Sequence, residues 1–470
     1  MTKLPDQQTL TIQQALDLGV EHQNAGRLAE AENVYQQILK GNPNQPVALR
    51  LLGTVAHQLG NNSLAVDLIT KAVAINPSDA EAYNNLGFSL YSLGKLEEAV
   101  ASYNEALAVE PNLADALNNL GNALMALGRL DEAVTRYRQA VAIDPDFAEA
   151  HKNLGYVLLM QGKLKEGWEQ YAWRLKTKDC EAPILPIEIW PGSSLQGKSI
   201  IVYAEQGVGD EIMFSSCIPD LLEQAPDKLF LACDYRLAAL FSRSFPGVIV
   251  HGTNRDMDLS WLGENGPPDY SLPIGSLPKF FRNRVEDFPE REAYLTPHPD
   301  LVEKWTQRLA SLKEGLKIGL SWKGGTKVNE IKRASIPLPD WQPLLSMDAS
   351  FINLQYGDIS EDIATLGDVH IHDWPDNDPL TDLDNQAALI SCLDLVVTID
   401  NATVHMSGAL GTRTWALIEH VPDWRWPEAF GDCPPLYRSV RLFRQKRPLE
   451  WGSVIERVTH ALEEMMGNPA

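Results

Sequence analysis

The 470-residue sequence predicts a protein of the α + α/β class, with an N-terminal helical solenoid followed by two Rossmann-like domains. Two observations support this prediction. Glycines and prolines recur every 34 residues through about the first third of the chain, and stacked units of that length are typical of solenoids. Beyond residue 197, apolar β-branched runs lead into glycine-containing or polar turns and then into helical spacing, which indicates parallel α/β sheets.

Residues 11–176 form the predicted repeat array. In the unit 80–111, apolar residues follow helical spacing on both sides of Gly94, which predicts two amphipathic helices. The small residues Gly87 and Ala99 allow these helices to cross closely. The recurring residues are Gly19, Gly53, Gly87, Gly121 and Gly155; Gly26, Gly60, Gly94, Gly128 and Gly162; and Pro43, Pro77, Pro111 and Pro145. Period and internal pattern resemble the tetratricopeptide repeat (TPR), and the fifth unit departs from it as a capping unit would.

Asparagine recurs at one repeat position, at Asn85, Asn119 and Asn153. An asparagine column on the concave face could pair with the main chain of an extended segment. The O-linked N-acetylglucosamine transferases have a similar ladder, and this resemblance implies a groove for a protein or peptide. The alternative is that asparagine before Leu-Gly belongs to the repeat itself, and Asp17 and Leu51 interrupt the column.

A Pro- and Gly-bearing linker is expected at 177–196, and next to it lies a sequence that imitates a phosphate-binding loop. Residues 192–199 read GSSLQGKS. A functional loop of this kind follows a strand and opens a helix, so that helix N–H groups surround the phosphate. Here Lys198 and Ser199 instead precede the predicted strand 200–203. We therefore expect the match to be coincidental.

The first α/β domain is expected at 197–294. Its strand 200–203 leads into a loop with Gly207 and Gly209, then into a helix that starts with Asp210 and Glu211. No third glycine stands at the dinucleotide spacing, so the loop does not predict a bound cofactor. The two carboxylates are expected to point into a cleft, where either could accept a proton. Strands are further expected at 228–232 and 248–251, followed by a loop-rich passage to residue 295.

The second α/β domain is expected at 295–470, with strands near 317–322, 351–355, 368–372 and 394–399. The last strand breaks at Asp400 and Asn401, and helical spacing resumes through Thr403 and His405. A helix that begins beyond the carboxyl end of a strand can bind phosphate through its free N–H groups. The alternative is an ordinary strand-turn-helix unit in which these polar residues only cap the helix.

Residues 317–333 hold five basic residues and one acidic residue in a chain of formal net charge -23. Such a local positive cluster suggests an anionic ligand, with Lys323, Lys332 and Arg333 as candidate contacts. The alternative is a solvated basic loop.

Three stretches resemble the bacterial heptosyltransferase family of GT-B glycosyltransferases, over about residues 197–465. They are Gly-Val-Gly-Asp210, the run from 389 to 397, and Asp400-Asn-Ala-Thr-Val-His405 with the following residues to Gly411. The resemblance implies an inverting, metal-independent transfer from a nucleotide-diphosphate sugar bound between the two domains.

By position, the resemblance assigns Asp210 as general base, the neighbouring loop to the acceptor side, and the turn from Asp400 to His405 to the donor site. Lys332 or Arg333 matches the pyrophosphate-binding lysine of that family. Ala402 stands where the family has glycine, and the distance from Lys323 to Arg333 is longer than usual. The repeat array is foreign to ordinary lipopolysaccharide heptosyltransferases, so neither sugar nor acceptor can be carried over.

Composition limits the remaining choices. A pI near 4.8 argues against nucleic acid as a partner. No run of 18 apolar residues and no signal-peptide core is present, so we expect no membrane span and a cytoplasmic location. Scattered cysteines and the isolated pair His370 and His372 predict no metal site. The two candidate functions are a glycosyltransferase that needs no cofactor, acting on a protein or peptide held by the repeats, and a scaffold whose α/β part only binds a nucleotide.

Overall fold

The computed structural model describes residues 2–3, 9–178, 180, 182–254, 258–324, 335–367 and 369–467. The chain divides into two compact units, Met1–Val157 and Leu158–Ala470. The division falls inside helix α9 (Ala148–Met160), within the fifth predicted repeat. The last helix of that repeat therefore belongs to the second unit.

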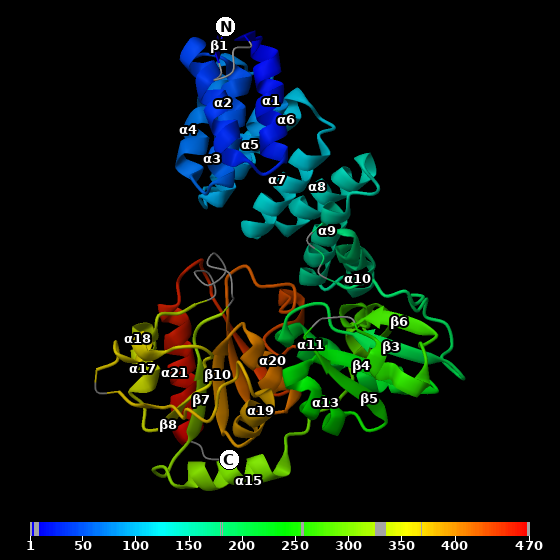
Figure 1. Cartoon of the computed structure of the whole chain (residues 1–470). Helices are drawn as coiled ribbons and strands as arrows, with labels where there is room; N and C mark the ends of the chain where they lie inside the picture. The colour runs from blue at the N-terminus through cyan, green and yellow to red at the C-terminus, as the bar shows by residue number, and fades with distance from the viewer. Residues whose placement is uncertain are drawn as a thin grey trace. The chain divides into compact units, whose positions relative to one another are not determined.

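The first unit consists of the predicted antiparallel helix pairs (Figure 1). They are α1 (Ile12–Asn24) with α2 (Leu28–Gly41), α3 (Pro46–Gln58) with α4 (Asn62–Ile75), α5 (Ala80–Ser92) with α6 (Leu96–Val109), and α7 (Ala114–Ala126) with α8 (Leu130–Ile143), followed by α9. Short strands β1 (Thr2–Lys3) and β2 (Thr9–Leu10) pair in front of α1. Gly26, Gly60, Gly94 and Gly128 adopt positive φ between paired helices, which explains that register of glycines.

A second register of glycines lets a tyrosine ring fill the space between the helices of a pair. Tyr103 packs on Gly87, and Tyr137 packs on Gly121; both rings are buried. A Cβ atom built on Gly121 would lie 2.5 Å from Cε1 of Tyr137, closer than atoms in contact allow. Glycine is thus required here by the neighbouring ring rather than by backbone conformation.

We predict that Gly121→Ala destabilises the repeat unit by about 1–3 kcal/mol, because the Tyr137 ring must move. Gly41→Ala is the matched control, since α2 leaves open space around Gly41. Replacing glycine by alanine in an unobstructed helix is neutral or stabilising by up to about 1 kcal/mol. Urea unfolding followed by far-UV circular dichroism measures both variants, and equal midpoints would contradict the packing role of Gly121.

The second unit begins with α10 (Leu164–Tyr171) and the 3₁₀ helix η1 (Ala172–Lys176), followed by a parallel four-stranded sheet of order β5-β4-β3-β6. Its strands are β3 (Ser199–Tyr203), β4 (Lys228–Asp234), β5 (Val248–Thr253) and β6 (Tyr270–Pro273). The accompanying helices are α11 (Val208–Ser215), α12 (Ile218–Leu222), α13 (Ala238–Ser244) and α14 (Pro278–Phe281).

A parallel six-stranded sheet follows, in the order β12-β11-β10-β7-β8-β9. Its strands are β7 (Lys317–Ser321), β8 (Ser350–Asn353), β9 (Ile371–His372), β10 (Leu395–Ile399), β11 (Thr414–Ile418) and β12 (Val440–Arg444). Its helices are α15 (Pro299–Ala310), α17 (Gln342–Leu345), α18 (Ser360–Ile363), α19 (Leu383–Ser391), α20 (Ala402–Ala409) and α21 (Gly452–Gly467). Further 3₁₀ turns in this unit are η2 (Tyr235–Leu237), η3 (Ser260–Asn265), η4 (Ile274–Ser276), η5 (Val285–Asp287), η6 (Leu338–Trp341) and η7 (Glu428–Phe430).

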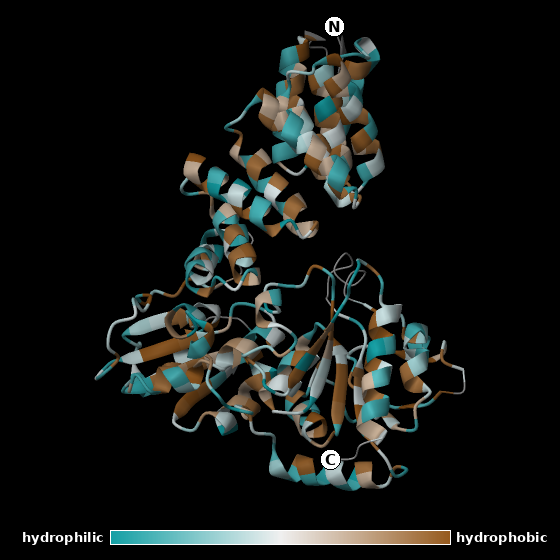
Figure 2. Ribbon diagram, turned by 180° about the vertical axis from the view of Figure 1, so that it is seen from behind, coloured by the Kyte–Doolittle hydropathy of each residue, from teal (hydrophilic) through white to brown (hydrophobic). Residues whose placement is uncertain are grey.

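Alternate residues of the larger sheet face a core shared with α17 and α21. Ile318 and Leu320 of β7 and Val397 and Ile399 of β10 belong to it, together with Val454 of α21. The intervening residues of β10 are buried as well, because helices cover both faces of the sheet. Figure 2 shows the hydrophobic character of the strands.

The sequence missed three strands. The passage expected to be loop-rich contains β6, a four-residue edge strand that ends with Pro273, which has no N–H to donate to a further strand. β11 was missed because it follows α20 after only a short turn at Gly411. β12 places Arg441 and Arg444 in an edge strand, which hid its apolar alternation.

Candidate functional site

A cavity of about 680 Å³ lies in the second unit, at the carboxyl ends of strands from both sheets. Its wall includes the loop after β3, residues that follow β4 and β8, the turn after β10, and the segment after β11. Parallel α/β sheets bind ligands at this end of their strands. The volume is in the range of small-molecule sites.

Helices α11 and α20 begin at this cavity and lie side by side (Figure 1). Gly209 permits their close approach, because a Cβ atom there would lie 3.2 Å from Cδ2 of His405 and 3.4 Å from Cα of Ala402. Gly207 is the N-cap of α11 and has more room, with its nearest neighbour 3.6 Å away. The two glycines of the loop therefore serve different purposes, and Gly209 is the one that fixes the helix contact.

Asp210 lines the cavity and forms an ion pair that the sequence did not predict. Its Oδ1 accepts a hydrogen bond from Nε of Arg425 at 3.0 Å and a second from Nη2 of the same residue. Arg425 also donates to Oδ1 of Asp423 at 2.6 Å and lies over the ring of Trp424. Burial lowers the pKa of Arg425, but Asp210 and Asp423 more than offset this and hold it well above its usual range. Because β11 was not recognised, the Trp-Arg-Trp sequence after it could not be placed at the sheet edge.

Glu211 does not point into the cavity, contrary to the expectation for both carboxylates. Its side chain is fully buried on the other side of α11, and Oε2 accepts a hydrogen bond from the main-chain N–H of Asp234 at 2.8 Å. Successive residues of a helix point about 100° apart, so only one of two neighbours can face the cavity. Glu211 fixes the end of β4.

The turn from Asp400 to His405 contains residues with different roles. Asn401 caps α20 through the N–H of Thr403 at 2.9 Å, and its amide donates to Oγ of Ser321 and the carbonyl of Lys323. It thereby ties the end of β10 to the end of β7, so the capping interpretation describes Asn401. Thr403 lines the cavity, and its hydroxyl has no hydrogen-bond partner among the described residues.

His405 is buried at the contact between the helices. Its Nδ1 and the Tyr437 hydroxyl are 3.0 Å apart, and its ring stacks on Trp426. Burial lowers the pKa of His405 to about 3, assisted by Arg425. The imidazole is therefore neutral at physiological pH, and it packs the helix contact as well as lining the cavity.

Asp400 lines the same cavity as Asp210. Burial and the nearby Asp423 carboxylate raise the pKa of Asp400 to about 7, while Trp426 and Arg425 act in the opposite direction. This carboxyl group can therefore bind or release a proton near neutral pH.

We predict that rising pH lowers the stability of the wild-type second unit through Asp400. The folded state holds this proton up to pH about 7, whereas the unfolded chain releases it near 3.8. Between these values the unfolded state binds fewer protons, so the free energy of unfolding falls as pH rises. Asp400→Asn cannot lose a proton and should gain stability relative to wild type between pH 5 and pH 8.

All 12 tryptophans lie in residues 158–470, so their fluorescence reports urea unfolding of this unit alone. Asp67→Asn, at an exposed position of the repeats, is the control and should follow the wild type. Parallel pH profiles for wild type and Asp400→Asn would show that this carboxyl is already ionised in the folded protein.

The cations at the cavity differ from those expected. Lys323 pairs with Oδ2 of Asp362 at 2.5 Å and is not among the residues that line the cavity. Lys332 and Arg333 lie outside the described residues. Within the described part of the chain, the lysine and arginine side chains that line the cavity are Arg236 and Arg425. Arg236 pairs with Asp234 and donates to the carbonyl of Leu380.

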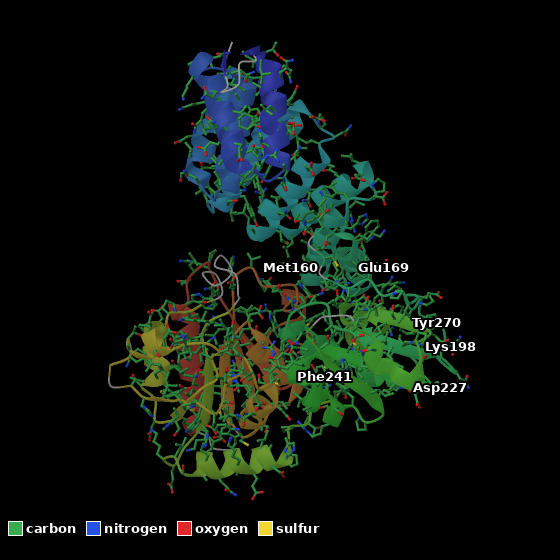
Figure 3. The ribbon with its side chains drawn as sticks, in the orientation of Figure 1. Met160, Glu169, Lys198, Asp227, Phe241 and Tyr270 are labelled. Atoms are coloured by element: carbon green, nitrogen blue, oxygen red, sulfur yellow. The ribbon has the colours of Figure 1, made fainter. Side chains whose placement is uncertain are left out.

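The GSSLQGKS sequence has a structural role. Lys198 pairs with Oδ1 of Asp269 at 2.8 Å, and the Ser199 N–H and hydroxyl bond to Oδ2 of the same residue. In Figure 3, Lys198 lies near Asp227 and Tyr270. It precedes β3, at the end of the sheet opposite to the cavity.

The asparagine column of the first unit is joined to the preceding repeats. Asn85 donates to Thr54 at 3.2 Å, Asn119 to Asn84 at 3.1 Å, and Asn153 to both Asn118 and Asn122. These amides therefore spend donors on contacts between repeats.

Two searches concern only the described residues. No helix there is long and apolar enough to cross a membrane. No group of three or more histidine, cysteine, aspartate or glutamate side chains there is arranged to hold a metal ion.

Comparison with known proteins places tetratricopeptide repeats in the N-terminal region. Models described as "TPR repeat" match residues 89–128 and 121–162, and models described as "Tetratricopeptide repeat" match 16–80 and 68–101. Protein FlbA of Caulobacter vibrioides is 37% identical over 313 residues, which are 63% of this chain and 52% of FlbA. The chain thus spans about half the length of this curated relative.

Solved structures match over about one third of the chain. A crystal structure of MamA is 26% identical with a TM-score of 0.31 and covers 34% of this chain and 92% of its own. A thermophilic TPR protein of Thermus thermophilus, TTC0263, is 30% identical with a TM-score of 0.33 and covers 36% of this chain and 93% of its own.

Proposed function

We propose that the second unit is an inverting, metal-independent glycosyltransferase of the GT-B type, which uses a nucleotide-diphosphate sugar. The observation that supports this proposal best is the shared cavity, where α11 of one sheet and α20 of the other begin together. Two helix starts supply N–H groups and positive partial charge suited to a diphosphate. Asp210 and Asp400 supply carboxyl groups at the same place.

In the proposed reaction, the acceptor hydroxyl oxygen attacks the anomeric carbon while a carboxylate removes its proton. The bond from that carbon to the diphosphate breaks, and the diphosphate leaves with the electron pair. We assign the base to Asp210, as the family resemblance implies, and the donor side to Asp400 and Thr403. Arg425 must release Asp210 for this step, and the departing diphosphate is a suitable new partner for the guanidinium.

For the tetratricopeptide repeats we propose a protein or peptide partner, which would bring the acceptor. A solenoid of stacked helix pairs offers an extended surface for such a partner. The asparagine column would contribute through those polar groups that the contacts between repeats leave available.

A specific observation favours the second candidate, a scaffold without catalysis. The Asp210–Arg425 ion pair joins the two α/β parts of the second unit, as does the pair of Arg243 with Asp384. Such pairs can be purely structural. A scaffold would bind nucleotide without transferring sugar, which separates the two candidates.

We predict that Asp210→Asn keeps nucleoside diphosphate affinity within about two-fold but lowers transfer by about 100-fold or more, because the proton acceptor is lost. Thermal shift with nucleoside diphosphates measures binding, since a ligand of the folded state raises the melting temperature. Turnover of a nucleotide-sugar panel measures transfer. Wild-type turnover by Asp210→Asn would exclude this residue as the base.

We predict that single alanine substitutions of Lys323, Lys332, Arg333 and Arg425 weaken diphosphate binding by about ten-fold or more wherever the cation touches phosphate. Lys198→Ala is the matched control, because it removes an equal charge at the opposite end of the sheet. If all four substitutions match the control, the cavity does not bind a diphosphate. A large effect of Lys198→Ala would instead support the phosphate-loop interpretation.

A further inference from the structure

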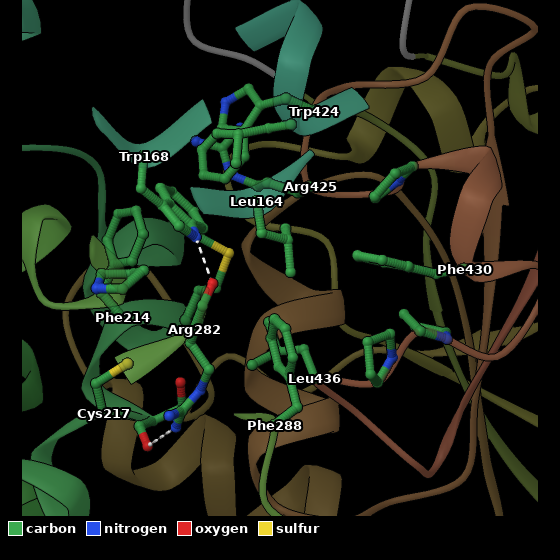
Figure 4. A pocket seen from close by; sticks show the side chains of 17 residues that line it. Leu164, Trp168, Phe214, Cys217, Arg282, Phe288, Trp424, Arg425, Phe430 and Leu436 are labelled. Atoms are coloured by element: carbon green, nitrogen blue, oxygen red, sulfur yellow. Dashed lines mark hydrogen bonds between the residues drawn. The ribbon is translucent and has the colours of Figure 1, made fainter. Parts of the chain in front are cut away.

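The segment Leu164–Lys176, formed by α10 and η1, is part of the α/β unit although the repeat pattern predicted it as a cap. The indole N–H of Trp168 donates to the main-chain carbonyl of Arg282 at 2.8 Å, and the ring is buried (Figure 4). Tyr171 is 1% exposed. Such burial exceeds what a cap that merely ends a solenoid needs, and the buried side chains hold other parts of the unit in place.

Arg174 holds the residue that enters the cavity loop. Its guanidinium donates two hydrogen bonds to the carboxylate of Glu205, one of them from Nε at 3.1 Å, and a third to Oγ of Ser276 at 3.0 Å. Glu205 also accepts from the N–H of Gly275 at 3.0 Å. Both charged side chains are buried, so the pair must stay intact for either charge to be tolerated. Glu205 is therefore fixed directly after β3.

Tyr171 holds the next residue of the same loop. Its hydroxyl accepts a hydrogen bond from Nε2 of Gln206 at 2.6 Å. Gln206 lines the cavity and directly precedes Gly207, the N-cap of α11. Two consecutive loop residues are thus fastened to the same segment, just before the helix that carries Asp210.

The segment also supports the cation that pairs with Asp210. The rings of Tyr171 and Trp168 lie 5.3 and 5.6 Å from the Trp424 ring. The Arg425 guanidinium lies over the ring of the same tryptophan, 4.4 Å from the ring centre. Figure 4 shows Trp168 and Trp424 close together beside Arg425.

We propose that α10 and η1 position the cavity loop and Arg425, with Tyr171 as the positioning residue, so that residues 197–470 alone do not contain a complete site. The effect on turnover rests on the proposed function. The effect on the loop does not, and it can be measured without any substrate.

Tyr171→Phe in the full chain tests this, because it removes one hydroxyl and keeps the ring. We expect amide hydrogen exchange in residues 204–212 to become about five-fold faster or more, with exchange in β10 unchanged. Tyr137→Phe is the matched control, since it removes an equally buried hydroxyl that bonds to Asn122 at 2.7 Å in the repeats. Equal exchange of 204–212 in the two variants would overturn the proposal.

A second measurement separates positioning from general destabilisation. Gln206→Met removes the other partner of the hydrogen bond, and the double variant should exchange no faster than either single variant, because both act through one contact. Additive effects would overturn the assignment to this bond. In transfer assays, Tyr171→Phe should lower kcat about three-fold or more with little change in KM. Faster exchange in a protein that transfers no sugar would support the positioning role and contradict the proposed function.

Discussion

The close approach of α11 and α20 is the contact on which the cavity depends. Gly209 makes it possible by leaving room for His405 and Ala402. The approach brings two helix N-termini to one place, and their positive partial charges would repel each other if nothing offset them. Asp210 and Asp400 stand at these two helix starts and supply that compensation. An anionic ligand would supply the same compensation, which explains why a site of this design can bind one.

Arg425 completes this charge balance. It meets Asp210 and Asp423 directly and lies near Asp400, so one guanidinium serves several carboxyl groups. With Arg425 committed to Asp210 and Asp423, Asp400 lies close to the Asp423 carboxylate and becomes easier to protonate. Any ligand that attracts Arg425 would alter the proton affinity of the neighbouring carboxyl groups. The electrostatics of the cavity are in this sense coupled, and the helix contact is what places the groups within reach of one another.

Local patterns in the sequence were sufficient for much of the fold. The 34-residue period predicted the helix pairs, because glycine in the turns and glycine beneath a tyrosine ring are requirements within a single unit. The turns after β3 and β10 were recognised for the same reason. Arg425 and Tyr171 could not be predicted in this way, because their partners lie 215 and 35 residues away in the chain. Lys323 shows the converse error, since a local excess of basic residues does not reveal that its ammonium group meets Asp362.

The position of the linker illustrates how sequence pattern and physical unit can differ. The repeat pattern ends near residue 176, and the Pro- and Gly-bearing stretch after it suggests a boundary there. Cutting the chain at that boundary would remove Arg174 and leave the buried Glu205 carboxylate without its cation, at a cost of about 3–5 kcal/mol for a buried pair of this kind. It would also remove the rings of Trp168 and Tyr171 from their contacts with Trp424. The boundary with fewer contacts lies earlier, within α9, where the chain divides into its two units. The final repeat therefore contributes its second helix to the α/β unit, and the interior of that unit, rather than the repeat period, determines what that helix must contain.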